Sequence, residues 1–117
     1  MPSFNKADTF AVPSTGASAI ITIPTTRVAT IRKAIAFNHT GGDKTLTIHI
    51  ANDGGAAAAA NKVDSAIVAA GKAYFPNLPG KIIPQGGKLY ALDAVGNEIT
   101  VDLSWSESTQ EEDAEYS

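Results

Sequence analysis

Short runs rich in β-branched residues, separated by glycine- and proline-containing turns, are the feature that most restricts the fold of this 117-residue chain. From residue 18 onward they recur at intervals of about eight to twelve residues, a spacing typical of β-sandwiches. The length fits one domain. The sequence therefore predicts an all-β fold, an antiparallel β-sandwich that is jelly-roll-like and has seven or eight short strands.

The last run is the clearest strand, because large apolar and polar residues alternate in it. Such alternation is typical of an antiparallel strand with one buried side. One face would carry Ile99, Val101, Leu103 and Trp105, and the other Thr100, Asp102, Ser104 and Ser106. The other expected strands span residues 19–23, 28–38, 44–51, 65–69, 72–78, 81–83 and 88–94.

The turns between neighbouring runs predict hairpins. Gly41-Gly42 suits a two-residue turn, because glycine accepts a positive φ at both central positions. That turn would place Phe37 opposite Leu46 and Ile35 opposite Ile48. A second turn is expected at Ala70-Gly71, and a final hairpin would join residues 88–94 to 98–105.

An alanine-rich segment follows the third expected strand. Residues 52–61 contain two glycines and then five consecutive alanines. Alanine favours helix, but so short a helix is unstable by itself. We expect a loop with one turn of helix around residues 57–61, spanning the gap between two sheets.

Charge divides the chain into a nearly neutral body and an acidic end. Residues 1–106 carry nine basic and seven acidic residues, whereas the last eleven carry five acidic residues and no basic one. Residues 1–17, with two prolines, are expected to form an extended N-terminal arm, and residues 18–106 the sandwich domain. Residues 107–117 are expected to form a flexible acidic tail.

Composition also argues against several classes of function. A nearly neutral body lacks the concentrated basic surface that nucleic-acid binding needs. The absence of cysteine excludes disulfides, thiol nucleophiles and cysteine-ligated zinc. No apolar segment is long enough for a transmembrane helix and no signal peptide opens the sequence, so we expect a soluble protein without membrane partners.

Few residues are available for catalysis or metal binding. The expected hairpin places His39 and His49 about 17 Å apart, too far to share an ion, and we interpret both as surface or loop residues. Asp93 and Asp102 would lie on the two arms of the last hairpin, but Asp102 is on the polar face. We therefore expect no enzymatic activity, no cofactor and no metal.

Contact residues are the more promising candidates. Phe4 and Phe10 are large apolar residues of the arm, which either fold onto this domain or dock on a neighbouring subunit. Tyr74 and Phe75 are adjacent, so they point to opposite faces and one is expected to be exposed. Trp105 is expected in the core. The basic residues that could meet an acidic partner, or simply discourage edge pairing, are Arg27, Arg32 and Lys33.

From Ile20 to Trp105 the order of these features resembles small structural proteins of tailed-bacteriophage virions. A strand ending in Ile-Pro-x-Thr precedes VATIRKAIAFNHT and the threonine-alternating strand TLTIHIAN. A Gly/Ala-rich loop ending near Asn61 follows, and then Ala-Ala-Gly before KAYF. A Gly-Gly turn before KLYALDA and the final strand EITVDLSW complete the pattern.

The resemblance implies a β-sandwich that decorates capsids or forms an accessory part of a tail, neck or baseplate. Its implied location is the virion, assembled in the host cytoplasm. The implied partners are the major capsid protein or other virion proteins, together with further copies of the chain in a homo-oligomer, for which a trimer is one option. A carbohydrate-binding module that uses Tyr74, Tyr90 or Trp105 is the alternative from another class of protein.

Overall fold

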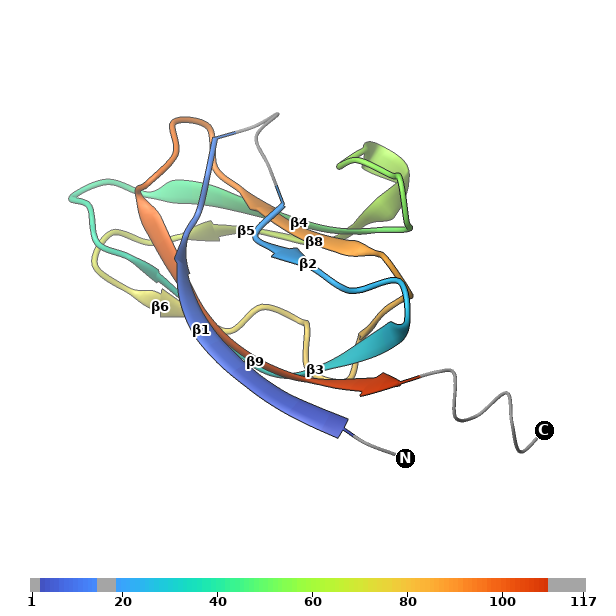
Figure 1. The fold of residues 1–117 in the computed structure, drawn as a ribbon. Coiled ribbons are helices and arrows are strands. Elements are labelled where there is room, and N and C mark those ends of the chain that lie inside the picture. The colour runs from blue at the N-terminus through green and yellow to red at the C-terminus, as the bar shows by residue number, and fades with distance from the viewer. Residues whose placement is uncertain (1–2, 15–18, 110–117) are drawn as a thin grey trace.

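The computed structural model describes residues 3–14 and 19–109 and shows two antiparallel sheets packed face to face (Figure 1). One turn of 3₁₀ helix, η1 (Ala59–Asn61), accompanies nine strands within these residues. The strands are β1 (Ser3–Ala11), β2 (Ile21–Thr22), β3 (Arg27–Asn38), β4 (Lys44–Ala51), β5 (Lys62–Val68), β6 (Ala73–Tyr74), β7 (Ile82–Ile83), β8 (Lys88–Leu92) and β9 (Ile99–Thr109).

The strand order is that of a jelly roll. One sheet has the order β1-β9-β3-β6, with β7 also paired to β3, and the other has the order β2-β8-β4-β5. If β6 and β7 are counted as one interrupted strand, the sandwich has eight strands in two rows of four. The all-β, jelly-roll-like prediction is confirmed.

Both predicted hairpins are wrong, and so is the expectation that the Ala70-Gly71 turn joins paired strands. Strands β3 and β4 lie in different sheets, as do β5 and β6, and β8 and β9. Neither Gly41 nor Gly42 has a positive φ. Phe37 is 41% exposed on the outside of its sheet, whereas Leu46 is buried in the core. Alternation correctly predicted that Leu46 and Ile48 face inward but failed for Phe37. The inward face of each strand packs on the opposite sheet rather than beside its neighbour in sequence.

Side chains from both sheets fill a single main core. β9 contributes its alternating face, as expected: Ile99, Val101, Leu103 and Trp105 are all buried. The opposite sheet contributes Ile21, Leu46, Ile48 and Leu89.

A bulge at Arg32 reverses the alternation of β3. Its pairing with β9 shifts register between Ile31 and Lys33. Ala29 and Ile31 are buried before the shift, and Ala34 and Ala36 are buried after it. The extra residue changes the parity of the inward positions, as a β-bulge does.

Strand β1 belongs to the sandwich sheet, although residues 1–17 were predicted to be an arm outside the domain. It pairs antiparallel with β9 from Ser3↔Ser108 to Ala11↔Thr100. In Figure 1, β1 (blue) lies along the outer side of β9 (red). The predicted tail also begins too early, because β9 extends to Thr109 and Glu107 is buried. The rest of that tail lies outside the described residues.

The alanine-rich segment joins two strands of the same sheet, so the expectation that it spans the gap between sheets is wrong. The expected helical turn is present as η1. His49 holds it in place, because its Nδ1 lies 2.9 Å from the Ala58 carbonyl oxygen and 3.0 Å from Asn61 Oδ1. Both of these partners are acceptors, so Nδ1 carries the proton. His49 is 6% exposed and lies in β4, so the expectation of a surface or loop residue is wrong for it.

Candidate interaction surface

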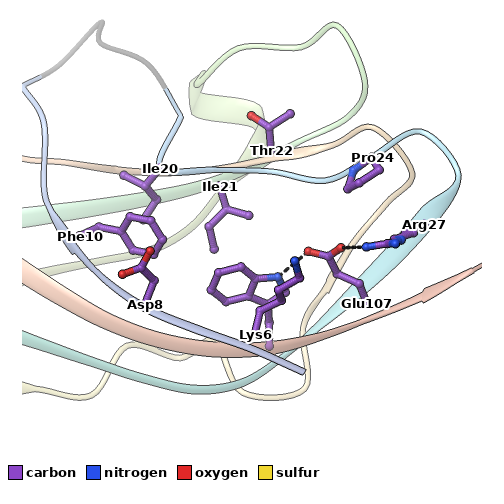
Figure 2. A pocket seen from close by; sticks show the side chains of 10 residues that line it. Lys6, Asp8, Phe10, Ile20, Ile21, Thr22, Pro24, Arg27 and Glu107 are labelled. Atoms are coloured by element: carbon purple, nitrogen blue, oxygen red, sulfur yellow. Dashed lines mark hydrogen bonds and ion pairs between the residues drawn. The ribbon is translucent and has the colours of Figure 1, made fainter. Parts of the chain in front are cut away.

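A groove of about 330 Å³ opens where β1 of one sheet faces β2 of the other (Figure 2). Its apolar floor includes Phe10 and Trp105, whose ring centroids are 6.3 Å apart. Lys6 and Asp8 of β1 line one side of the groove, and Arg27 and Glu107 lie at one of its ends. The groove lies between edge strands and has charged walls, a composition suited to contact with another polypeptide.

Glu107 organises one end of this groove. One carboxylate oxygen accepts the indole N–H of Trp105 at 2.8 Å, and the other pairs with Arg27 at 3.0 Å. The Arg27 guanidinium in turn lies 3.8 Å from the centre of the Phe4 ring, a cation–π geometry. Local sequence does not predict this role for Glu107, because it is one of the acidic residues of the C-terminal end.

The predicted partner-binding residues therefore separate into distinct groups. Phe4, Phe10 and Arg27 make contacts within their own chain at the groove. Arg32 lies at the β3 bulge, where its Nε donates to Ser106 Oγ at 3.2 Å, and Lys33 beside it is exposed. Arg27 is the first residue of β3, five positions before Arg32. The three basic residues therefore do not form one compact cluster.

Tyr74 and Phe75 differ in exposure, as expected for adjacent residues. Tyr74 packs against the core, and its hydroxyl donates to Asp64 Oδ2 at 2.9 Å. The same oxygen accepts the backbone N–H of Asn77, so one carboxylate ties the segment after β6 to β5. Phe75 is 70% exposed. Of the two, only Phe75 offers a free ring to a partner.

Because the pKa of Tyr74 is raised in the folded state, part of the stability of the fold is lost at alkaline pH. Burial first, and then the hydrogen bond to Asp64, raise the pKa of Tyr74 above its ordinary value of 10.0. The folded state thus retains this proton at pH values where the unfolded state has lost it. The stabilisation is complete below pH 10 and decreases as the pH rises toward the higher folded-state pKa.

We expect Tyr74→Phe to remove this alkaline component and to cost about 1 kcal/mol of unfolding free energy at pH 7. Urea unfolding from pH 7 to 11 measures both effects, with absorbance at 295 nm following the phenol. If the variant and the wild type lost stability in parallel above pH 10, Tyr74 would not be the group responsible.

Three large apolar side chains are exposed at separate points along the opposite edge of the sandwich, which β5, β6 and β7 form. Ile67 of β5 and Phe75 are each 70% exposed, and Ile82 of β7 is 59% exposed. Ile82 also borders a second groove, of about 440 Å³, together with Lys62 and Lys81. We call Ile67, Phe75 and Ile82 the apolar edge. Of these three residues the sequence indicated only Phe75, as one of the adjacent pair Tyr74 and Phe75, because isolated isoleucines in short β runs resemble core residues.

Within the described residues, Asp93 and Asp102 do not form a pair, and neither do His39 and His49. Asp93 is buried in a tight turn, where its Oδ1 accepts the N–H groups of Val95 and Gly96. Asp102 is exposed on the other sheet, so the two do not meet. His39 is exposed, whereas His49 is enclosed by the loop before β5. Over residues 3–14 and 19–109, no three His, Asp or Glu residues form a metal-binding group.

The aromatic residues considered for sugar stacking do not form an open platform. Trp105 is 8% exposed and Tyr90 6%, and Tyr74 is engaged by Asp64. Sugar-binding platforms need an accessible ring face, so these residues do not support a carbohydrate-binding module.

No protein-family model matches the chain, and no curated protein sequence is significantly similar to it. The described part of the chain contains no helix long and apolar enough to cross a membrane.

Proposed function

We propose that this protein is a non-enzymatic structural component of a bacteriophage virion, a decoration protein that binds and stabilises the head lattice. The observation that supports the proposal most strongly is the apolar edge. Its three large side chains are more than half exposed, although the chain has a well-filled core of its own. Several large apolar side chains exposed along one edge of a folded domain suit an extended contact with another protein.

The resemblance of residues 20–105 to small virion proteins supplies the class of partner. The fold agrees with that role, because a jelly roll with buried aromatic rings and bonded turns forms a rigid module. Repetition on a lattice would strengthen each weak contact, since many copies bind neighbouring equivalent sites. The partner we propose is the major capsid protein, together with adjacent copies of this chain.

Substitutions at the apolar edge test the proposal. We expect the combined variant Ile67→Thr, Phe75→Ser and Ile82→Thr to bind purified expanded capsids at least about tenfold more weakly than the wild type. Co-sedimentation with capsids measures the change. Val95→Ser is the matched control, because Val95 is 70% exposed but lies in the turn between β8 and β9, outside the apolar edge. Equal binding by the triple variant and the wild type would contradict the proposed surface.

Copy number in purified particles decides between head and tail. Quantitative mass spectrometry should find this chain in numbers comparable with the capsid subunit. A far smaller number would favour a neck, tail or baseplate component. Absence from particles would overturn the proposal as a whole.

A further inference from the structure

Strand β1 presents a long free edge. It is the terminal strand of its sheet, and no described strand pairs with its outer side. It has nine residues, whereas the edge elements β2, β6 and β7 have two residues each. Strand β5, the remaining edge, has the segment from Tyr74 to Asn77 tied to it through Asp64. β1 is therefore the edge best suited to adding another strand.

The pairing with β9 determines which backbone groups of β1 are available. Val12 is in register with Ile99, and its N–H donates to the Ile99 carbonyl at 2.9 Å. Hydrogen-bonded pairs alternate along an antiparallel ladder, so the even-numbered residues of β1 bond to β9. The odd-numbered residues, centred on Ala7, direct their N–H and C=O groups to the free edge. A new strand must use these odd positions.

The even-numbered side chains of β1 would then meet those of the added strand. Phe4, Lys6, Asp8 and Phe10 lie on the face of β1 that carries the groove residues. A single Lys and a single Asp on an edge disfavour pairing with an uncharged strand, because each would lose solvation without gaining a partner.

We propose that β1 pairs antiparallel with β1 of a second copy, with Ala7 of both chains on a two-fold axis. In this register Lys6 of each chain lies opposite Asp8 of the other, and Phe4 lies opposite Phe10. Both are non-hydrogen-bonded pairs, the type in which side chains approach most closely. The odd-numbered positions supply about ten hydrogen bonds between the two backbones.

Neighbouring registers are unfavourable for electrostatic reasons. Because hydrogen-bonding positions must pair with one another, the nearest alternatives centre the axis on Lys6 or on Asp8. The first places two lysines opposite each other, and the second places two aspartates opposite each other. Asp8 Oδ1 accepts the Thr9 N–H at 2.8 Å in the single chain, and pairing would release this N–H to the second strand. The dimer does not depend on the proposed virion function.

Charge exchange at positions 6 and 8 tests the pairing. Sedimentation equilibrium from micromolar to millimolar concentration should show the 12.1 kDa chain forming a dimer. Lys6→Asp and Asp8→Lys alone should each raise the dissociation constant about tenfold or more, because each creates two like-charge pairs. The double exchange should restore dimerisation, and so should mixing the two single variants. Trimers, or no association up to millimolar concentration, would overturn the proposal.

Cysteine cross-linking tests the register directly, because the chain has no cysteine of its own. Ala7→Cys should form an intermolecular disulfide, since hydrogen-bonded partners have Cα atoms about 5.5 Å apart. Ala11→Cys is the matched control: it is also exposed on β1, but the two copies would be roughly 26 Å apart. Cross-linking of both variants at similar rates, or of Ala11→Cys alone, would overturn the register.

A proline at position 7, on the proposed two-fold axis, distinguishes loss of edge pairing from loss of folding. Ala7→Pro removes an N–H that β9 does not use, so the circular dichroism spectrum should be retained while dimerisation is lost. A variant that stays folded and dimerises like the wild type would contradict pairing through β1.

Discussion

Asn38→Ala should lower the free energy of unfolding by about 3 kcal/mol, the largest effect expected for a polar residue of this chain. Asn38 is fully buried at the point where the chain leaves β3 for the opposite sheet. Its amide nitrogen donates to the carbonyl oxygens of Gly42 at 2.8 Å and Val68 at 2.9 Å. Its Oδ1 accepts from the backbone N–H and the hydroxyl of Thr40 at 2.9 and 2.7 Å. Alanine would leave these groups without their partner at the corner that joins the two sheets.

Urea unfolding measures the effect, with His39→Ala as the matched control. His39 is adjacent in sequence but exposed, so its replacement should change the unfolding free energy by less than about 0.5 kcal/mol. Asn38→Asp separates bonding from packing. It retains the size of the residue but places an acceptor against the carbonyls of Gly42 and Val68, and should cost at least as much as alanine. A loss below about 1 kcal/mol in both variants would show that the corner does not depend on Asn38.

Glu107→Ala should cost about 2–3 kcal/mol of unfolding free energy. Its side chain is 6% exposed and serves two donors, the Trp105 indole and the Arg27 guanidinium, whose side chain is 27% exposed. Without the carboxylate, the buried indole N–H loses its acceptor and Arg27 loses its counter-charge. The partial exposure of Arg27 keeps the cost below that of breaking a fully buried ion pair.

The matched control is Asp102→Asn, an acidic residue of the same strand that is exposed. It should change stability by less than about 0.5 kcal/mol. Glu107→Gln retains an acceptor for the indole and should recover part of the loss. Near-ultraviolet circular dichroism reports on Trp105 in each variant. Equal stability of Glu107→Ala and Asp102→Asn would show that Glu107 behaves as a residue of a solvated tail.

Local pattern predicted the direction of side chains well in β9 but not in β3, where the bulge at Arg32 reverses the alternation. Alternation in residues 99–105 correctly assigned the buried face of β9, and adjacency correctly indicated that only one of Tyr74 and Phe75 is exposed. The same pattern did not predict strand partners. Gly41-Gly42 is compatible both with a hairpin and with a corner between sheets, and nothing in those residues distinguishes the two.

For the contact residues the sequence left alternatives open. Phe4 and Phe10 were expected either to fold onto this domain or to dock on a neighbouring subunit, and in the structure they contact Arg27 and Trp105 of the same chain. Residues 1–17 were predicted to be an arm because they contain two prolines and show no lasting periodicity. The charged residues of β1, Lys6 and Asp8, are the ones that make its free edge complementary to a second copy in the proposed dimer.

The sequence by itself determined an all-β sandwich of short strands, a core rich in β-branched residues, and the absence of cysteine chemistry. Those properties follow from period, turn residues and composition, which act over a few neighbouring residues. Only the tertiary structure decided that consecutive strands cross between sheets, that β1 closes one side of β9, and that Glu107 belongs to the folded domain. These features depend on contacts such as Arg27 with Glu107 and Asn38 with Val68, which join residues far apart in the chain. Their energies arise only when the two sheets pack together.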